Sequence, residues 1–293
     1  MNTINGFIKR QHMKNGDYEI FHSLDIDIKN FDYHHHDFYE VYFFIGGNVS
    51  YVIEGKKYPL MPGDIILLSP YELHQVINHD ETVHYERFVL WMNETMIRSL
   101  SDETTDLGRC FDSKAENFRR LIRLSKSRYT SLLSSFDRLC DIFYGESFGK
   151  ELMQRALLTQ LLIEINELLD QQDYNDADLD ITHNDFIINI LNYITKNLTG
   201  DLSLQRISDH FYISQYHLCR EFKKNMGISI HKYVIGKRLA LSKQLIEKGH
   251  SFSSAAAGSG FVDYTGFYRS FVKQYKMNPK EYAKNIKINP GNS

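Results

Sequence analysis

Cysteine is scarce in this chain, and long apolar runs are missing from it. The three cysteines among the 293 residues, Cys110, Cys140 and Cys219, are odd in number and far apart, so neither a disulfide framework nor a zinc ribbon is indicated. No apolar run approaches the roughly 20 residues that a membrane-spanning helix needs, and the amino-terminal stretch has no apolar core of signal-peptide length. We therefore expect a cytoplasmic protein without a membrane segment.

Acidic residues are scarce in the last third of the chain. Residues 181–293 contain 16 Lys and Arg but only 7 Asp and Glu, whereas residues 1–180 contain 18 and 30. The surplus of +9 and the deficit of −12 together give the net charge of −3. A basic segment is typical of a protein that binds a polyanion, because lysine and arginine displace counterions from phosphates. A solvated surface would show the same surplus, so charge alone does not decide.

The basic region contains an internal repeat. The segments SQYHLCREFKK, beginning at Ser214, and DYTGFYRSFVK, beginning at Asp263, share a large apolar fifth residue, an arginine at the seventh position and a phenylalanine at the ninth. All of these positions are 49 residues apart, and the stretches upstream match with a shift of one residue. The pattern indicates a duplicated structural unit that is longer than one helix.

Each copy is predicted to be a helix, a short turn and a second helix. Ser203, Ser214 and Asp263 are of the types that favour the position before a helix. In the second helix of each copy, two apolar residues four apart face inward, so the other side chains are available to a DNA major groove about 12 Å wide. The predicted DNA-binding residues are Gln215, Tyr216, Cys219, Arg220 and Lys223 in the first copy and Tyr264, Thr265, Tyr268, Arg269 and Lys273 in the second. The alternative is an all-helical domain in which these helices only pack.

Further motifs connect the repeat to a known family. The first copy continues into MGISIHKYV and KRLALSKQLI, and the second contains GF and NPKEY. Together these segments resemble the DNA-binding domain of the AraC/XylS transcription regulators over about 100 residues. The resemblance implies two helix-turn-helix units, joined by a long helix, that enter successive major grooves on one face of DNA.

The amino-terminal half has a different pattern. The segment FYEVYFFIGGNVSYVIEGKKYPLMPGDIILLSP consists of short β-rich runs separated by turns, which predicts the hairpins of a small barrel or a double sheet. The spacing of His34, His36, Glu40 and Gly47 resembles the first cupin motif, and PGDIILLSPYELH, which ends at His74, resembles the second. The resemblance implies a cupin-like sensor domain, a common partner of this DNA-binding domain in sugar-responsive regulators.

Side-chain parity predicts a binding site in this half. A strand that begins at His34 would point His34, His36, Glu40 and Tyr42 to one face, and His35 to the other. The addition of His74 from the second motif completes the predicted ligand-binding set: His34, His36, Glu40, Tyr42 and His74.

Three interpretations of this set remain open. Imidazoles and a carboxylate can bind a divalent metal, as in cupin enzymes, or they can be purely structural. We favour a pocket for a small-molecule effector such as a sugar, because Tyr39, Tyr42 and Tyr51 can stack on a sugar face. Neither a metal nor any other cofactor is predicted.

The region between the two halves is predicted to be helical. In ELMQRALLTQLLIEINELLDQQ the apolar residues form a stripe that Leu157 and Ile163 widen beyond one packing surface. Such a helix has two packing partners, for which we consider the barrel and a second subunit, since the family resemblance also implies a dimer here. Core packing alone is the alternative. The acidic stretch DQQDYNDADLD, which begins at Asp170, is typical of a linker.

The sequence thus predicts an α+β protein of two domains. The expected parts are a cupin-like β-barrel sensor at 1–112, a helical dimerisation or packing region at 113–172, a linker at 173–182 and an all-α double helix-turn-helix domain at 183–293. Double-stranded DNA, an effector, a second subunit and RNA polymerase are the expected partners. The function predicted is ligand-responsive transcription regulation, with carbohydrate uptake or utilisation genes as targets.

An enzyme is the competing class. The sequence shows no nucleophile elbow and no phosphate-binding loop, which favours a non-enzymatic protein. The alternative is a metal-dependent cupin enzyme that its carboxy-terminal domain tethers to DNA.

Overall fold

The computed structural model describes residues 3–4, 13–14, 16–26, 33–113, 115–170, 182–275 and 277–288. The chain divides into an amino-terminal unit, Met1–Ile53 with Lys57–Thr182, and a carboxy-terminal unit, His183–Ser293 with Glu54–Lys56. The predicted linker at 173–182 lies, up to residue 181, outside the described residues.

One sheet of the amino-terminal unit has six strands in the order β1-β2-β8-β3-β6-β9. Apart from the parallel β1–β2 pair, its neighbours are antiparallel. The strands are β1 (Thr3–Ile4), β2 (Tyr18–Asp25), β3 (Tyr39–Gly46), β6 (Asp64–Leu68), β8 (Tyr85–Met92) and β9 (Leu121–Arg123). A second sheet contains β5 (Lys56–Pro59), β4 (Val49–Ile53) and β7 (His74–Asn78) in that order, and the short β10 (Thr182–His183) marks the boundary of the unit.

Alternation along β3 separates two cores. Val41 and Phe43 are buried on the face of the six-stranded sheet that the helices cover. Tyr42 and Phe44 are buried on the opposite face, where they pack with residues of the second sheet such as Tyr51. Successive side chains of a strand point to opposite faces, which explains why this strand is apolar almost throughout.

The predicted barrel needs a correction. Within the described residues the strands form two hydrogen-bonded sheets and no closed barrel. The sequence allowed either a barrel or a double sheet, because hairpin signals specify which strands are neighbours along the chain but not whether the last strand pairs with the first.

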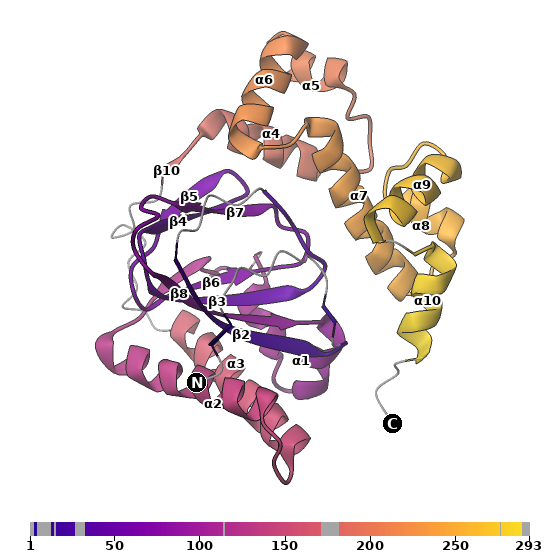
Figure 1. Ribbon diagram of the computed structural model, residues 1–293. Coiled ribbons are helices and arrows are strands. Elements are labelled where there is room, and N and C mark those ends of the chain that lie inside the picture. Colours follow the sequence, from indigo (N-terminus) through magenta and orange to yellow (C-terminus); the bar gives the residue numbers. More distant parts are fainter. Residues whose placement is uncertain are drawn as a thin grey trace. The chain divides into compact units, whose positions relative to one another are not determined.

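Helices cover the outer face of the six-stranded sheet (Figure 1). They are α1 (Glu94–Leu100), a short 3-10 helix η1 (Leu107–Phe111), α2 (Lys126–Tyr144) and α3 (Lys150–Asp170). Leu158, Leu162 and Ile165 of α3 are fully buried in this core, whereas Ile163 is 40 % exposed. The wide apolar stripe of α3 is therefore mostly covered within the chain.

The predicted helical region differs from the structure at its beginning. Residues 121–123 form β9, which pairs with β6 as the edge of the sheet, and the first helix starts only at Lys126. Three residues are too few to show a strand period, so the pairing of Leu121 and Ile122 depends on a tertiary contact that the sequence does not reveal.

Helices α4 to α10 make up most of the carboxy-terminal unit. They span α4 (Asp185–Lys196), α5 (Leu204–His210), α6 (Gln215–Met226), α7 (Ile230–Glu247), α8 (Phe252–Gly258), α9 (Tyr264–Tyr275) and α10 (Pro279–Ile288). The start of α8 lies 48 residues after that of α5, and the start of α9 lies 49 residues after that of α6. The repeat and its one-residue shift are thus two copies of the same helix pair, with α7 between them.

The turns inside the two helix pairs share an uncommon backbone conformation. Gly260 has φ 90°, and a Cβ there would lie 2.7 Å from the carbonyl oxygen of Leu198. The equivalent residue of the first copy is Tyr212, with φ 55°. Its side chain is 95 % exposed, so the first copy tolerates a bulky residue in the left-handed region at some cost in strain.

Candidate functional site

The predicted DNA-binding helices are held by caps and by buried phenylalanines. The side chain of Ser214 accepts a hydrogen bond from the backbone N–H of His217, and Oδ1 of Asp263 accepts one from Gly266 at 2.7 Å. These two predicted caps are confirmed, and so is the third, because the side chain of Ser203 accepts a hydrogen bond from the backbone N–H of Arg206. Phe222 in α6 and Phe271 in α9 are fully buried, so each helix has a fixed inner face.

The opposite faces of α6 and α9 carry the predicted contact residues. Nine of the ten are exposed, and Cys219 is half-buried. Arg220 lies 5.8 Å from the centre of the Tyr216 ring and pairs with Glu221 at the surface. Exposed arginine and tyrosine on a capped helix are suited to base edges and phosphates.

The second candidate site is a cavity between the two sheets of the amino-terminal unit. Among the residues that line it are four of the five predicted ones: His34, His36, Glu40 and Tyr42. His74 is next to them, because its ring centre lies 4.2 Å from that of His34 and 4.9 Å from that of His36. The cavity measures about 40 Å³, enough for a few water molecules.

Glu40 is the most heavily bonded group of the cavity. Its Oε1 accepts a hydrogen bond from the hydroxyl of Tyr51 at 3.0 Å, and its Oε2 accepts one from the indole N–H of Trp91 at 2.7 Å. The same oxygen lies 3.1 Å from Nε2 of His36. Burial raises the pKa of this carboxyl. The opposing effects are larger and hold the pKa below its usual value: the hydrogen bond and charge of His36, the charge of His34 and the hydrogen bond from Trp91.

The parity argument for His36 agrees with the structure, although the strand begins later than expected. β3 starts at Tyr39, and His34 forms only an isolated bridge with His74. His36 is nevertheless buried, as are Glu40 and Tyr42, whereas His35 is half-buried. Nδ1 of His36 donates to the carbonyl oxygen of Phe38 at 2.9 Å, which fixes the ring.

A buried ion pair at the other end of the cavity was not predicted. Arg87 on β8 is 2 % exposed, pairs with Asp25 on β2 and lies 4.1 Å from the centre of the Tyr85 ring. The hydroxyl of Tyr85 is 2.6 Å from that of Tyr42. Alternation along β8 would have indicated this set, because Tyr85, Arg87 and Trp91 share parity and therefore one face.

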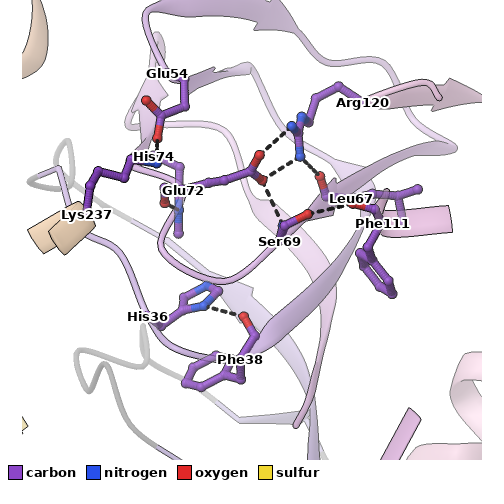
Figure 2. A network of polar contacts seen from close by, with 10 residues as sticks. All are labelled: His36, Phe38, Glu54, Leu67, Ser69, Glu72, His74, Phe111, Arg120 and Lys237. Carbon is purple, nitrogen blue, oxygen red and sulfur yellow. Dashed lines mark hydrogen bonds and ion pairs between the residues drawn. The ribbon is translucent and has the colours of Figure 1, made fainter. Parts of the chain in front are cut away.

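Polar contacts hold the segment between β6 and β7 in place (Figure 2). Arg120 donates to both carboxylate oxygens of Glu72, each at 2.5 Å, and to the carbonyl oxygen of Leu67. The carboxylate of Glu72 also accepts the N–H of Ser69 at 2.7 Å, and the hydroxyl of Ser69 donates to the carbonyl oxygen of Phe111. His74, at the end of this segment, is thereby positioned against the cavity.

Two family models match the chain. The AraC-like ligand binding domain matches residues 19–162, and the helix-turn-helix domain matches residues 207–285. The first match includes the residues that line the cavity, and the second includes α6, α8, α9 and the part of α5 from Ile207 onward.

Curated relatives align with most of the chain. The probable transcriptional regulator LumQ of Photobacterium leiognathi is 27 % identical over 255 residues, which are 87 % of this chain and 92 % of the relative. The HTH-type transcriptional activator RhaS of Escherichia fergusonii is 22 % identical over 254 residues, 86 % of this chain and 87 % of the relative.

Solved structures give weaker matches. ToxT from Vibrio cholerae is 15 % identical, with a TM-score of 0.37, over 91 % of this chain and 98 % of that chain. A Listeria innocua protein of unknown function is 30 % identical, with a TM-score of 0.33, over 33 % of this chain and 94 % of that chain.

Among the described residues, no helix has the length and apolar character to cross a membrane. The two family models, the alignments with transcription regulators over 86–87 % of the chain and the two capped helix pairs agree with one another. The chain therefore belongs to the AraC family of transcription regulators, with a ligand-binding domain followed by a DNA-binding helix-turn-helix domain.

Proposed function

We propose that this protein regulates genes for carbohydrate uptake or utilisation in response to a small sugar-like effector. The observation that carries the proposal is the combination of two exposed, capped helices in one unit with a buried polar and aromatic cavity in the other. The named relatives are transcription regulators, which supports a non-enzymatic role over a DNA-tethered cupin enzyme.

Each predicted contact residue receives a role in this proposal. Arg220 and Arg269 read bases, because arginine can bind guanine with two hydrogen bonds. Lys223 and Lys273 bind phosphates, which carry no sequence information. The contacts completing the two surfaces are Gln215, Tyr216 and Cys219 from α6 and Tyr264, Thr265 and Tyr268 from α9.

A fragment that begins at His183 tests the DNA-binding part. Residues 183–293 contain both helix pairs and α7, so this fragment should bind operator DNA with an affinity that falls steeply between about 50 and 200 mM salt. It should not respond to any effector. Fluorescence anisotropy with labelled operator and with a scrambled duplex gives both measurements.

The same fragment sets the condition for rejecting the scheme. Circular dichroism first establishes that the fragment is helical. If the fragment is folded but shows no salt-sensitive DNA binding, the proposed function is wrong, whatever the amino-terminal unit binds.

The effector class follows from the cavity lining. Tyr42, Tyr51, Tyr85 and Trp91 offer ring faces with polar tips, and Glu40 offers a carboxylate. Burial and the neighbouring Glu40 raise the pKa of Tyr51 well above its usual value, so it remains a hydroxyl. Aromatic faces beside hydrogen-bonding groups suit a sugar. Since the cavity is small, such an effector would bind only after lining side chains move.

Replacing His36 by alanine tests this role. We expect the variant to lose the effect of inducer on operator binding while its ligand-free DNA affinity stays within about two-fold, because a ligand acts only through differential affinity for two states. The matched control is His35→Ala, which removes a half-buried ring of opposite parity and should respond like wild type. Inducers come from a thermal-shift screen of sugars, since a ligand raises the melting temperature by mass action.

If both histidine variants lost the effect of inducer on operator binding equally, the result would indicate that the cluster has only a structural role. So would a melting temperature of His36→Ala that falls far below that of wild type without inducer.

The proposal includes two protein partners. Ile163 and Leu152 of α3 are 40 % and 76 % exposed, and exposed apolar residues on a long helix support a homodimer. RNA polymerase is the second partner, because a regulator that binds promoter DNA acts on transcription by contacting or blocking the polymerase.

A further inference from the structure

A row of three exposed side chains connects the two helices of the first helix pair. Nε2 of Gln215, at the start of α6, donates a hydrogen bond to Oε1 of Gln205 on α5 at 2.6 Å. Nε2 of Gln205 in turn donates to Oδ1 of Asp209, one turn further along α5, at 2.7 Å. These three residues form what we call the glutamine relay: Gln215, Gln205 and Asp209.

The carboxylate of Asp209 fixes the direction of both amides. A carboxylate accepts hydrogen bonds and cannot donate them, so the amide nitrogen of Gln205 faces Asp209 and its amide oxygen faces Gln215. That oxygen requires a donor, and the amide of Gln215 therefore turns an N–H toward α5. The relay thus has one arrangement of donors and acceptors, whereas the nitrogen and oxygen of an isolated amide can exchange places.

The bonds of the relay leave one donor and one acceptor of Gln215 for a partner. Among the described residues, its second N–H and its Oε1 have no protein partner. Adenine presents a matching pair in the major groove, because its N7 accepts and its N6 amino group donates, and glutamine binds both. Guanine presents two acceptors there, so an adjacent donor and acceptor fit it less well.

Gln215 lies where a reading helix meets the edges of bases. It is the first residue of α6, directly after the cap Ser214. In helix-turn-helix proteins the amino-terminal residues of the recognition helix contact base edges. The side chain of Gln215 is exposed, as are those of Tyr216 and Arg220 on the same helix. Its remaining donor and acceptor are thus available to a base.

The second helix pair lacks the relay, which argues against a purely structural role. The starts of α8 and α9 lie 48 and 49 residues after those of α5 and α6. The residues at the positions corresponding to the relay are Ser253, Ala257 and Tyr264. The second pair forms the same helix, turn and helix without it, and exposed hydrogen bonds add little stability because water competes for both partners. The relay is therefore not needed to hold the two helices together.

We propose that Gln215 recognises one adenine of the operator and that Gln205 and Asp209 are positioning residues, which hold its amide in the direction that adenine requires. The inference rests on the proposed reading of DNA by α6, and it adds the base that the first helix pair selects. The second pair should show no preference of this origin, because Tyr264 stands at the position that corresponds to Gln215.

In vitro selection from a library of random duplexes by the full chain identifies the base concerned. Wild type and Gln215→Ala are tested in parallel against the same library. One position should lose its preference for adenine in the variant, while the preferences at other positions remain. At that position wild type should bind adenine about 5- to 100-fold more tightly than the other bases, which is the range for one contact of two hydrogen bonds.

Replacing Gln205 tests the positioning role, because the replacement can reverse the amide of Gln215. Gln205→Lys offers only donors and can still pair with Asp209, so Oε1 of Gln215 should turn toward α5 and its amide nitrogen toward the DNA. The preference at the selected position should then shift from adenine to guanine, whose N7 and O6 both accept. Gln205→Glu keeps an acceptor for Gln215 and should keep the preference for adenine.

A modified base tests the contact itself. An adenine analogue with a carbon–hydrogen group in place of N7 lacks the acceptor but still pairs with thymine. Placed at the selected position, it should weaken binding by wild type about 3- to 10-fold, the loss of one hydrogen bond. Binding by Gln215→Ala should not change. The analogue decides the question should Gln205→Lys fail to fold.

The matched control for the lysine substitution is Gln160→Lys. Nε2 of Gln160 donates to Oε1 of Glu164, an exposed bond over four residues on α3 of the amino-terminal unit, so the control makes the same change of charge beside a similar acid. It should keep the base preference of wild type. Affinities for two bases are compared within one variant, so a general gain from the added positive charge cancels.

The contradicting results differ for each part. If Gln215→Ala loses affinity equally for all bases, the residue contacts a phosphate and the proposal is overturned. If Gln205→Lys keeps the preference for adenine, the positioning role is wrong. Specific binding that is indifferent to the base at every position affected by the analogue refutes the relay alone, whereas an absence of salt-sensitive DNA binding refutes the proposed function.

Discussion

Replacing Asp25 by alanine should lower the free energy of unfolding of the amino-terminal unit by about 3–5 kcal/mol. The carboxylate of Asp25 is paired with Arg87, and the two side chains are 3 % and 2 % exposed. Burial lowers the pKa of Arg87, but Tyr85, Tyr42 and Asp25 together raise it above its usual value. Arg87 therefore stays charged. The variant therefore leaves a positive charge in the interior without its carboxylate.

Chemical denaturation with urea, followed by tryptophan fluorescence, measures this loss, since Trp91 is the only tryptophan and lies in the same unit. The matched control is Arg98→Ala, which breaks an exposed pair with Glu94 in the same unit and should cost less than about 1 kcal/mol. Similar losses in both variants would contradict the importance of the buried pair.

The double variant Arg220→Ala/Arg269→Ala should lose about 2–6 kcal/mol of operator affinity, or roughly 30-fold to more than 10⁴-fold, because each arginine is proposed to contribute one two-bond contact to guanine worth about 1–3 kcal/mol. Binding to a scrambled duplex should weaken much less, because the phosphate contacts are kept. The ratio of the affinity for operator to the affinity for the scrambled duplex should therefore fall strongly.

Lys223→Ala is the control for this variant. Lys223 is an exposed residue of α6 that we assign to a phosphate, so its removal should weaken all sequences alike and reduce the salt slope by about one. Anisotropy titrations at several salt concentrations separate the two behaviours. A double arginine variant that loses specific and scrambled binding equally would refute base reading by these residues.

The sequence predicts the carboxy-terminal unit well, because its information is local. Ser214 and Asp263 cap helices whose inner residues are four apart, and these features need no distant partner to be recognised. The repeat shows the same pattern of cap and inner residues twice, which strengthens the prediction. Exposure of Arg220 and Arg269 then follows from helix periodicity alone.

The amino-terminal cavity is only half predictable, because it is assembled across strands. The predicted parity places His36 and Glu40 together, although β3 begins only at Tyr39. The partners of Glu40, Tyr51 and Trp91, come from β4 and β8. The pairing of Arg87 with Asp25 depends on the register of β2 against β8, which single-strand patterns leave undetermined. Nδ1 of His74 lies 2.8 Å from the backbone carbonyl oxygen of Glu72, and this contact has no sequence signature.

Helix α7 runs unbroken for 18 residues and packs against both α6 and α9, which has a consequence for avidity. Its length is about 27 Å, at about 1.5 Å per residue, and it links α6 and α9 stiffly. If both helices read DNA as proposed, the second encounter with DNA is intramolecular and occurs at a high effective concentration. This gain in affinity requires both half-sites to lie on the same face of the duplex. An operator whose half-sites are moved apart by about five base pairs, half a turn of the duplex, would present the second half-site on the far side and reduce binding to the affinity of one module.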